Sequence, residues 1–81
     1  MDVRIKELIA IGASVTANCQ PCLKYHVNEA KESGADEQEI TEAIAVAKMV
    51  RKGAASKMDQ LASNVFTDVG LNSKASENEC G

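Results

Sequence analysis

The sequence predicts an all-α fold, a small helical subunit that is completed by oligomerisation. Apolar residues recur at three- and four-residue steps in successive stretches, and this is the period of one helical face. Residues that favour helix starts and ends, such as Asp2, Pro21 and Gly34, separate those stretches. No stretch alternates apolar and polar residues as a half-buried strand does, and no internal repeat is present.

The expectation of oligomerisation follows from length and composition. A chain of 81 residues buries only about 60 to 65% of the surface that its unfolded form exposes. Its aromatic side chains are limited to Tyr25 and Phe66, and Ala, Val and Ile supply most of the apolar side chains. Small scaffolds of this kind usually need disulfides, a metal or further subunits. We therefore expect further subunits to complete the thin core.

The first helix is predicted over residues 2–16, with Asp2 as its N-cap. Its apolar and small side chains fall on one face, at Ile5, Leu8, Ile9, Gly12, Val15 and Thr16. A second helix starts around Gln20, because Asn18 or Cys19 can cap it and proline is tolerated in a first helical turn. Ser33-Gly34 ends this helix, since glycine accepts the left-handed conformation that often follows a helix C-terminus.

A third helical segment begins after Asp36, which forms a capping box with Glu39. Its apolar stripe comprises Ile40, Ala43, Ile44, Ala47 and Val50, and a continuing stripe comprises Ala54, Met58, Leu61, Ala62 and Val65. Gly53 between them leaves open whether this is one bent helix or two. The predicted domain is therefore 1–66, and 67–81 is predicted to be a flexible C-terminal tail with little to bury.

Charge and hydropathy exclude some classes of partner. Nine basic and twelve acidic residues give a formal net charge of −3, without a basic run that would bind phosphates, so no nucleic-acid partner is expected. No stretch approaches the roughly 20 apolar residues of a membrane span, and the N-terminus lacks the pattern of a secretory signal. We expect a cytoplasmic protein with no membrane partner. Basic residues spread along the third helical segment are interpreted as a solvated face: Lys48, Arg51, Lys52 and Lys57.

The residues that carry chemistry are Cys19-Gln20-Pro21-Cys22 and His26. At about 100° per residue, the two cysteines and the histidine fall within about 60° of one another on a helix. A thiolate is stabilised at a helix N-terminus, and His26 can take or return a proton one turn after Cys22. The two-residue spacer allows the sulfurs to form a disulfide. The pattern indicates a thiol–disulfide redox centre.

Three other interpretations of these residues remain open. The cysteines could be ordinary small buried residues. They could be metal ligands, because zinc and iron–sulfur sites use the same spacing, and pairs from neighbouring subunits could then hold an iron–sulfur cluster on Cys19 and Cys22. They could also belong to an interaction module that only responds to oxidation. A further thiol, Cys80, lies in the predicted tail. It could reach the disulfide of a neighbouring subunit, but an exposed free thiol without a role is favoured.

Glu7 is the next candidate. Its own stripe on the first helix is Val3, Ala10, Ile11 and Ser14, with no other charge. A partly buried carboxylate at this position would suit proton exchange with a histidine. The spacing alone slightly favours a flank position with the carboxylate in water.

These residues together resemble the carboxymuconolactone decarboxylase superfamily, in its alkylhydroperoxidase D-like branch, over residues 4–62. The similarity rests on Glu7, eleven residues, Cys19-x-x-Cys22, three residues and His26, followed by Gly34-Ala35 and Glu39-Ile40-x-Glu42-Ala43. The resemblance implies an all-helical subunit that forms trimers or hexamers. It also implies that Glu7, His26 and both thiols form a proton relay serving peroxide or disulfide reduction.

Two departures from the family pattern narrow the expected activity. Hydroperoxidase members typically have a histidine where this chain has Pro21, so a disulfide is favoured over a peroxide as substrate. The decarboxylases lack the cysteine pair, so lactone decarboxylation is not implied. We expect a thiol–disulfide oxidoreductase that requires no cofactor, takes protein or small-molecule disulfides or peroxides and a thiol electron donor, and forms a homo-oligomer (trimer, hexamer or dimer). Cys19 is expected to be the more exposed thiol that meets the disulfide, with Cys22 coupled to His26 and Glu7.

Overall fold

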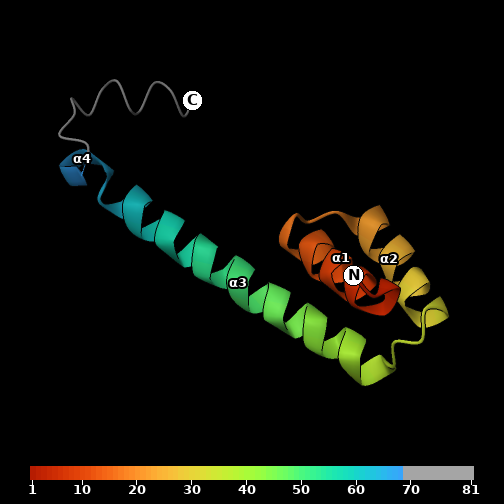
Figure 1. Ribbon diagram of the computed structural model, residues 1–81. Helices are drawn as coiled ribbons and strands as arrows, with labels where there is room; N and C mark the ends of the chain where they lie inside the picture. The colour runs from red at the N-terminus through yellow and green to blue at the C-terminus, as the bar shows by residue number, and fades with distance from the viewer. Residues whose placement is uncertain (69–81) are drawn as a thin grey trace.

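The computed structural model describes residues 1–68, which fold as helices joined by short connections. The helices are α1 (Val3–Thr16), α2 (Gln20–Glu32), α3 (Glu37–Ser63) and the short α4 (Val65–Asp68). No strand occurs among these residues, so the predicted all-α fold is confirmed. Figure 1 shows α1 lying between α2 and the first half of α3, while the second half of α3 projects away from the other two helices. The part of the predicted tail after residue 68 lies outside the described residues.

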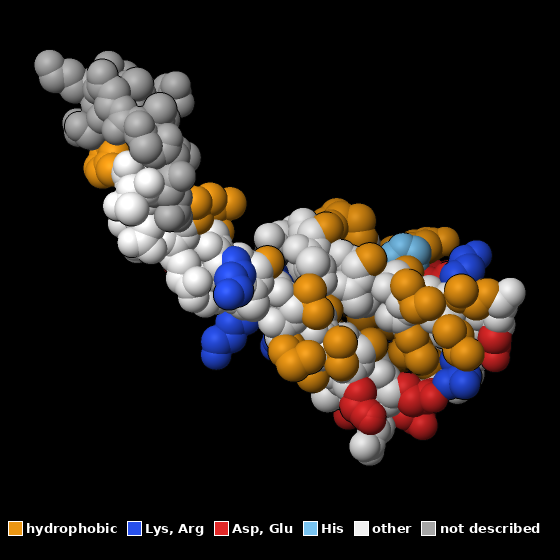
Figure 2. All heavy atoms as spheres, turned by 60° about the vertical axis from the view of Figure 1, so that its left-hand side comes forward, with side chains coloured by type: hydrophobic (Ala, Val, Ile, Leu, Met, Phe, Trp, Pro, Cys, Tyr) orange, Lys and Arg blue, Asp and Glu red, His pale blue; other side chains and the backbone are white. Residues whose placement is uncertain are grey.

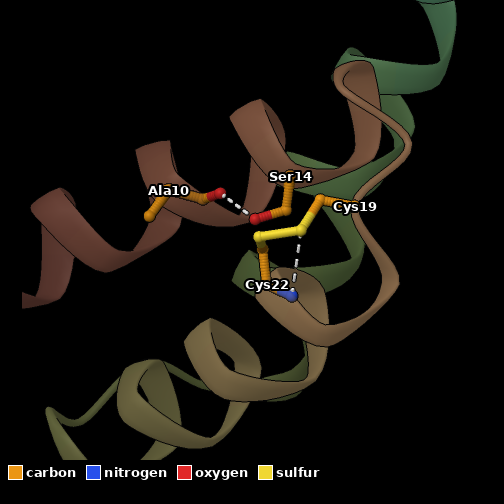
Figure 3. Close-up of a disulfide and its surroundings, with 4 residues drawn as sticks. All are labelled: Ala10, Ser14, Cys19 and Cys22. Atoms are coloured by element: carbon orange, nitrogen blue, oxygen red, sulfur yellow. Dashed lines mark hydrogen bonds between the residues drawn. A yellow bond between two sulfur atoms is a disulfide. The ribbon is translucent and has the colours of Figure 1, made fainter.

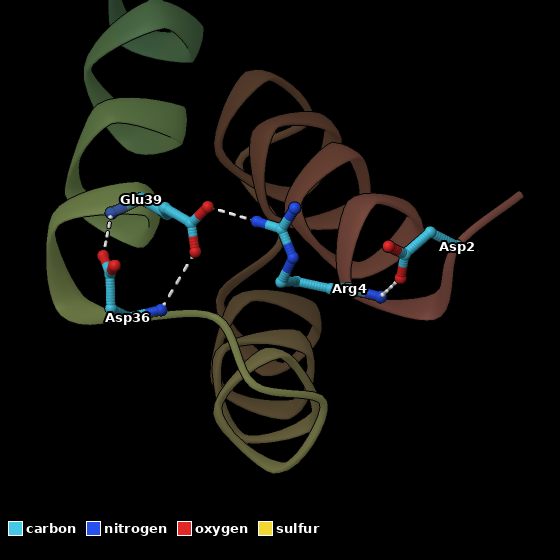
Figure 4. Close-up of polar contacts among 4 residues, drawn as sticks. All are labelled: Asp2, Arg4, Asp36 and Glu39. Carbon is cyan, nitrogen blue, oxygen red and sulfur yellow. Dashed lines mark hydrogen bonds and ion pairs between the residues drawn. The ribbon is translucent and has the colours of Figure 1, made fainter.

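The helix boundaries follow from local caps, as predicted. The Asp2 side chain accepts a hydrogen bond from the Arg4 amide at the start of α1. At the start of α3, the Asp36 carboxylate accepts from the Glu39 amide and the Glu39 carboxylate accepts from the Asp36 amide (Figure 4). Gly34 adopts φ +96° just after α2, which is the left-handed conformation that ends the helix.

The core lies where α1 packs between α2 and α3. Ile11 and Ala30 are fully buried, and Ala35 and Ile40 are nearly so. Partly buried apolar side chains surround them: Leu8, Leu23, Val27, Ala43 and Ile44. An ion pair between Arg4 of α1 and Glu39 of α3 closes one end of this packing (Figure 4). The core is small and rich in alanine, as the composition predicts.

The face of α1 that is turned to the core differs from the apolar stripe seen in the sequence. The buried residues of α1 are Glu7, Ile11, Ser14 and Val15. Ile5 and Ile9 lie beside α3 but are not covered by it, and they are 42% and 56% exposed. The stripe instead borders an apolar groove between α1 and α3, which we call the α1/α3 groove and which is lined by Ile5, Ile9, Gly12, Val46 and Val50 among others.

Gly53 does not interrupt α3, which is a single helix of 27 residues. Neither α1 nor α2 covers the far end of α3, where Met58 and Leu61 are 63% and 46% exposed. Figure 2 shows hydrophobic side chains at the surface of the helical body and along the projecting part of α3. None of the described helices is long and apolar enough to cross a membrane.

Candidate active site

The two cysteines form a disulfide at the N-terminus of α2 (Figure 3). Cys19 is the N-cap, Pro21 lies in the first turn, and the Cα atoms of Cys19 and Cys22 are 5.3 Å apart. The Cys22 amide donates a hydrogen bond to Cys19 Sγ, with an N···S distance of 3.3 Å. An anionic sulfur accepts such a bond more strongly than a neutral one does. The first turn of α2 therefore provides stabilisation for a thiolate on Cys19.

Exposure of the cysteines is the reverse of the sequence expectation. Cys22 is the exposed residue and Cys19 is half-buried. The expectation was wrong because it assumed that the residue nearer the helix end has more access to solvent. Cys19 instead follows directly on the turn after α1, where its amide donates to the Ser14 carbonyl over 2.9 Å.

Glu7 and His26 come together from α1 and α2. The Glu7 residue is 7% exposed, and its Oε1 lies 2.6 Å from His26 Nδ1. The spacing alone slightly favoured a carboxylate in water. The structure shows instead that Glu7 faces the interior between the helices. A carboxylate on Nδ1 fixes the orientation of the imidazole and leaves Nε2 to exchange protons with another group. His26 also meets the ring of Tyr25 edge-on, with centroids 5.0 Å apart.

Ser14 belongs to the surroundings of the disulfide, a position that the sequence analysis did not assign. Figure 3 shows its side chain pointing toward the disulfide from α1. Ser14 is buried, and its hydroxyl donates to the Ala10 carbonyl over 2.7 Å. The sequence could have indicated this position, because Ser14 lies two helical turns after Glu7 and therefore on the same face of α1. This stripe is the side of α1 that faces the active residues of α2.

Arg51 corrects another expectation. It was grouped with Lys48, Lys52 and Lys57 as a solvated face, and those three lysines are exposed. Arg51 is half-buried, and its Nη1 donates to the Val15 carbonyl and to Asn18 Oδ1, each over 3.0 Å. Asn18 adopts φ +57° in the turn between α1 and α2, which brings its side chain to α3. Arg51 thereby joins α3 to the turn that carries Cys19.

Within residues 1–68, no group of three or more His, Cys, Asp or Glu side chains could hold a metal ion. A cluster on Cys19 and Cys22 would therefore need further ligands, as the iron–sulfur alternative already assumes by invoking a second subunit. Cys80 lies outside the described residues.

Comparisons with known proteins show which family the chain belongs to. A family model described as the carboxymuconolactone decarboxylase family matches residues 1–71. The chain belongs to this family. The carboxymuconolactone decarboxylase family includes decarboxylases and alkylhydroperoxidases, so membership is compatible with redox chemistry without fixing one activity.

A curated relative in Paracoccus denitrificans, described as "Uncharacterized protein 4 in cox locus", is 42% identical over 55 residues, which are 68% of this chain and 50% of that protein. The chain thus spans about half the length of this relative. No solved structure matches the chain.

Proposed function

We propose that this protein is a thiol–disulfide oxidoreductase that reduces disulfides with Cys19 and Cys22. The observation that carries the proposal is the disulfide at the N-terminus of α2, followed one helical turn after Cys22 by His26, whose ring is paired with the buried Glu7. A structural disulfide needs no such proton-carrying pair one turn away. A catalytic one does, because each thiol must lose a proton before it attacks and regain one afterwards.

The reaction proceeds through two exchanges. The Cys19 thiolate attacks one sulfur of the substrate disulfide, a mixed disulfide forms, and the first substrate thiolate leaves. Cys22 then gives its proton to the relay of His26 and Glu7 and attacks Cys19 Sγ, which closes the intramolecular disulfide and expels the second substrate thiolate. Two electrons have passed to the substrate, and a thiol donor returns them to the protein by the reverse exchanges.

Cys19 is assigned as the attacking thiol for a reason other than exposure. The Cys22 amide points at Cys19 Sγ, and Cys19 lines a cavity whereas Cys22 does not. Pro21 replaces the histidine that peroxide-reducing members typically have, so we place disulfides ahead of peroxides as substrates. The protein requires no cofactor for these steps.

Cys22→Ser tests the two-thiol cycle. The reduced variant is expected to attack a disulfide substrate once and to stop as a mixed disulfide on Cys19, because no second thiol is in place to resolve it. Mass spectrometry of the peptide that contains residue 19 measures this adduct, and turnover should fall to the uncatalysed rate. Sustained turnover in the variant would show that the two-thiol cycle is wrong.

We also propose that the functional unit is a homo-oligomer in which a second copy covers the α1/α3 groove and the second half of α3. The support is an apolar surface that the described residues leave open, to which Val46 and Val50 contribute at 56% and 53% exposure. Single soluble subunits seldom present a continuous apolar surface of this kind to water. A trimer, a hexamer or a dimer would each bury it.

A further inference from the structure

A cavity of about 350 Å³ lies beside Cys19, between α1, the start of α2 and α3. Its apolar lining includes Leu23 and Ile44, and its charged lining consists of Lys48 and Arg51. No carboxylate of the described part of the chain lines it, although the chain as a whole has a net charge of −3. The cavity is therefore locally basic in an acidic protein, and it has a redox-active sulfur in its wall.

Arg51 uses only part of its guanidinium in contacts with the described residues. Its two contacts, with the Val15 carbonyl and with Asn18, both use Nη1. A guanidinium has five N–H donors. Those on Nε and Nη2 have no acceptor among residues 1–68, so they can bind a ligand. The planar fork of arginine matches a carboxylate in a two-bond arrangement. Neither Lys48 nor Arg51 forms an ion pair with a carboxylate among the residues that the structure describes.

We infer that this cavity binds a small thiol, or the disulfide formed from it, through a carboxylate held by Lys48 and Arg51, with the sulfur directed at Cys19. The inference rests on the proposed function and names its substrate class. The cavity volume falls at the lower end of the range of about 300 to 1,000 Å³ that small-molecule sites occupy. A lining that combines Cys19, two apolar side chains and two cationic ones suits a short chain that is charged at one end and carries sulfur at the other.

The chemical step for a thiol donor is balanced. The donor thiolate attacks Cys19 Sγ, the bond between Cys19 and Cys22 breaks, and Cys22 leaves as a thiolate that takes a proton through His26. A second donor thiolate attacks the donor sulfur of the mixed disulfide, so the donor disulfide is released and Cys19 regains its thiolate. The two donor thiols lose two electrons and two protons. The protein pair gains both electrons, Cys22 takes one proton, and the other proton goes to the solvent while Cys19 stays a thiolate. Reduction of a carboxylate-bearing disulfide is the reverse sequence.

The test compares three thiols of similar size that differ in charge: 3-mercaptopropionate, 2-mercaptoethanol and cysteamine. Each reduces the disulfide of the full chain, and each rate is divided by the rate of the same thiol with a neutral small-molecule disulfide. We expect a normalised preference of about tenfold for 3-mercaptopropionate over 2-mercaptoethanol, comparable to the effect of one hydrogen bond to a charged group. Cysteamine should be the slowest, and added salt should reduce the preference.

Lys48→Gln supplies the variant, because the Lys48 side chain is exposed and its loss does not disturb the packing. It should lower the preference for 3-mercaptopropionate by about threefold, as expected for one partly screened charge, and Lys48→Glu should move the preference toward cysteamine. Lys57→Gln, on the same helix but outside the cavity, is the matched control and should keep the wild-type preference.

Equal normalised rates for all three thiols would overturn the inference and leave the proposed function standing, since the disulfide would still be reduced. An unchanged preference in Lys48→Gln would also overturn it. A disulfide that none of the thiols reduces would overturn the proposed function together with the inference.

Discussion

Glu7 places a carboxylate in the packing between α1 and α2, where His26 is its hydrogen-bond partner at 2.6 Å. Burial of a charged group costs free energy unless a partner compensates it. The pair links α1 to α2, and the hydrogen bond to the imidazole offsets part of the cost of burying the carboxylate. In the proposed function, the same pair also carries the protons that the two thiols exchange.

Glu7→Gln tests this role. The substitution keeps the size of the side chain but removes the charge that orients and supports the imidazole. Disulfide turnover should fall by on the order of 100-fold, the lower end of the range for general acid–base catalysis. Glu42→Gln, an exposed position on α3, is the control and should turn over at the wild-type rate.

The same pair can be examined by a double-mutant cycle. If Glu7 and His26 act as a unit, His26→Asn alone should cost nearly as much activity as His26→Asn combined with Glu7→Gln. Turnover of the two single variants and the double variant measures the coupling. Fully additive losses would mean that the two residues act independently.

Local spacing predicted part of the site, and non-local packing decided the rest. Cys19, Cys22 and His26 could be grouped from the helical period alone, because they lie within a few residues of one another. Glu7 needed the family resemblance, since its burial depends on how α2 packs on α1. Arg51 was misassigned because its contacts with Val15 and Asn18 join residues 36 and 33 positions apart, and no local pattern encodes them.

For the helices α1, α2 and α3, the sequence predicted where each one starts, but it did not predict which face of α1 is buried. Caps such as Asp2 and Asp36 act through neighbouring amides, so sequence suffices to place them. Gly53 left the continuity of α3 open, because one glycine inside a helix costs only about 1 kcal/mol relative to alanine. The apolar stripe at Ile5 and Ile9 correctly predicted the helix α1, but these two side chains are exposed. Periodicity alone does not say which neighbouring helix covers which face.

Two glycine-to-alanine substitutions distinguish the effect of backbone conformation on stability from the effect of packing. Gly34 has φ +96° and Gly53 is helical, and an added Cβ would meet nothing within 4 Å at either position. Gly34→Ala should destabilise the fold by about 1 to 2 kcal/mol, because the left-handed conformation strains other L-residues.

Gly53→Ala should instead stabilise α3 by up to about 1 kcal/mol through helix propensity. Thermal or denaturant unfolding measures both changes. A loss of stability in Gly53→Ala would mean that something approaches this face closely in the folded protein.

At the scale of the whole molecule, the open apolar surface is the main unsatisfied feature of the single chain. Val46, in the α1/α3 groove, is 56% exposed. A charge placed there would be buried without a partner if a second copy covers the groove, and such burial is strongly unfavourable.

Val46→Asp is therefore expected to shift the protein toward the monomer, as measured by analytical ultracentrifugation. Thr41→Asp is the matched control, because Thr41 is also an exposed β-branched residue of α3 but does not line the groove. It should keep the wild-type mass. A wild-type protein that sediments as a monomer would contradict the proposed oligomer.

The most direct test of the central claim counts thiols and metal in the same sample of the native full chain, before and after reduction. We predict that the peptide linking Cys19 to Cys22 gains two hydrogens on reduction, that a disulfide substrate closes the bond again, and that no iron or sulfide accompanies the pair. A reduced pair that stays open in the presence of substrate disulfide, or iron and sulfide held by these cysteines, would contradict the account.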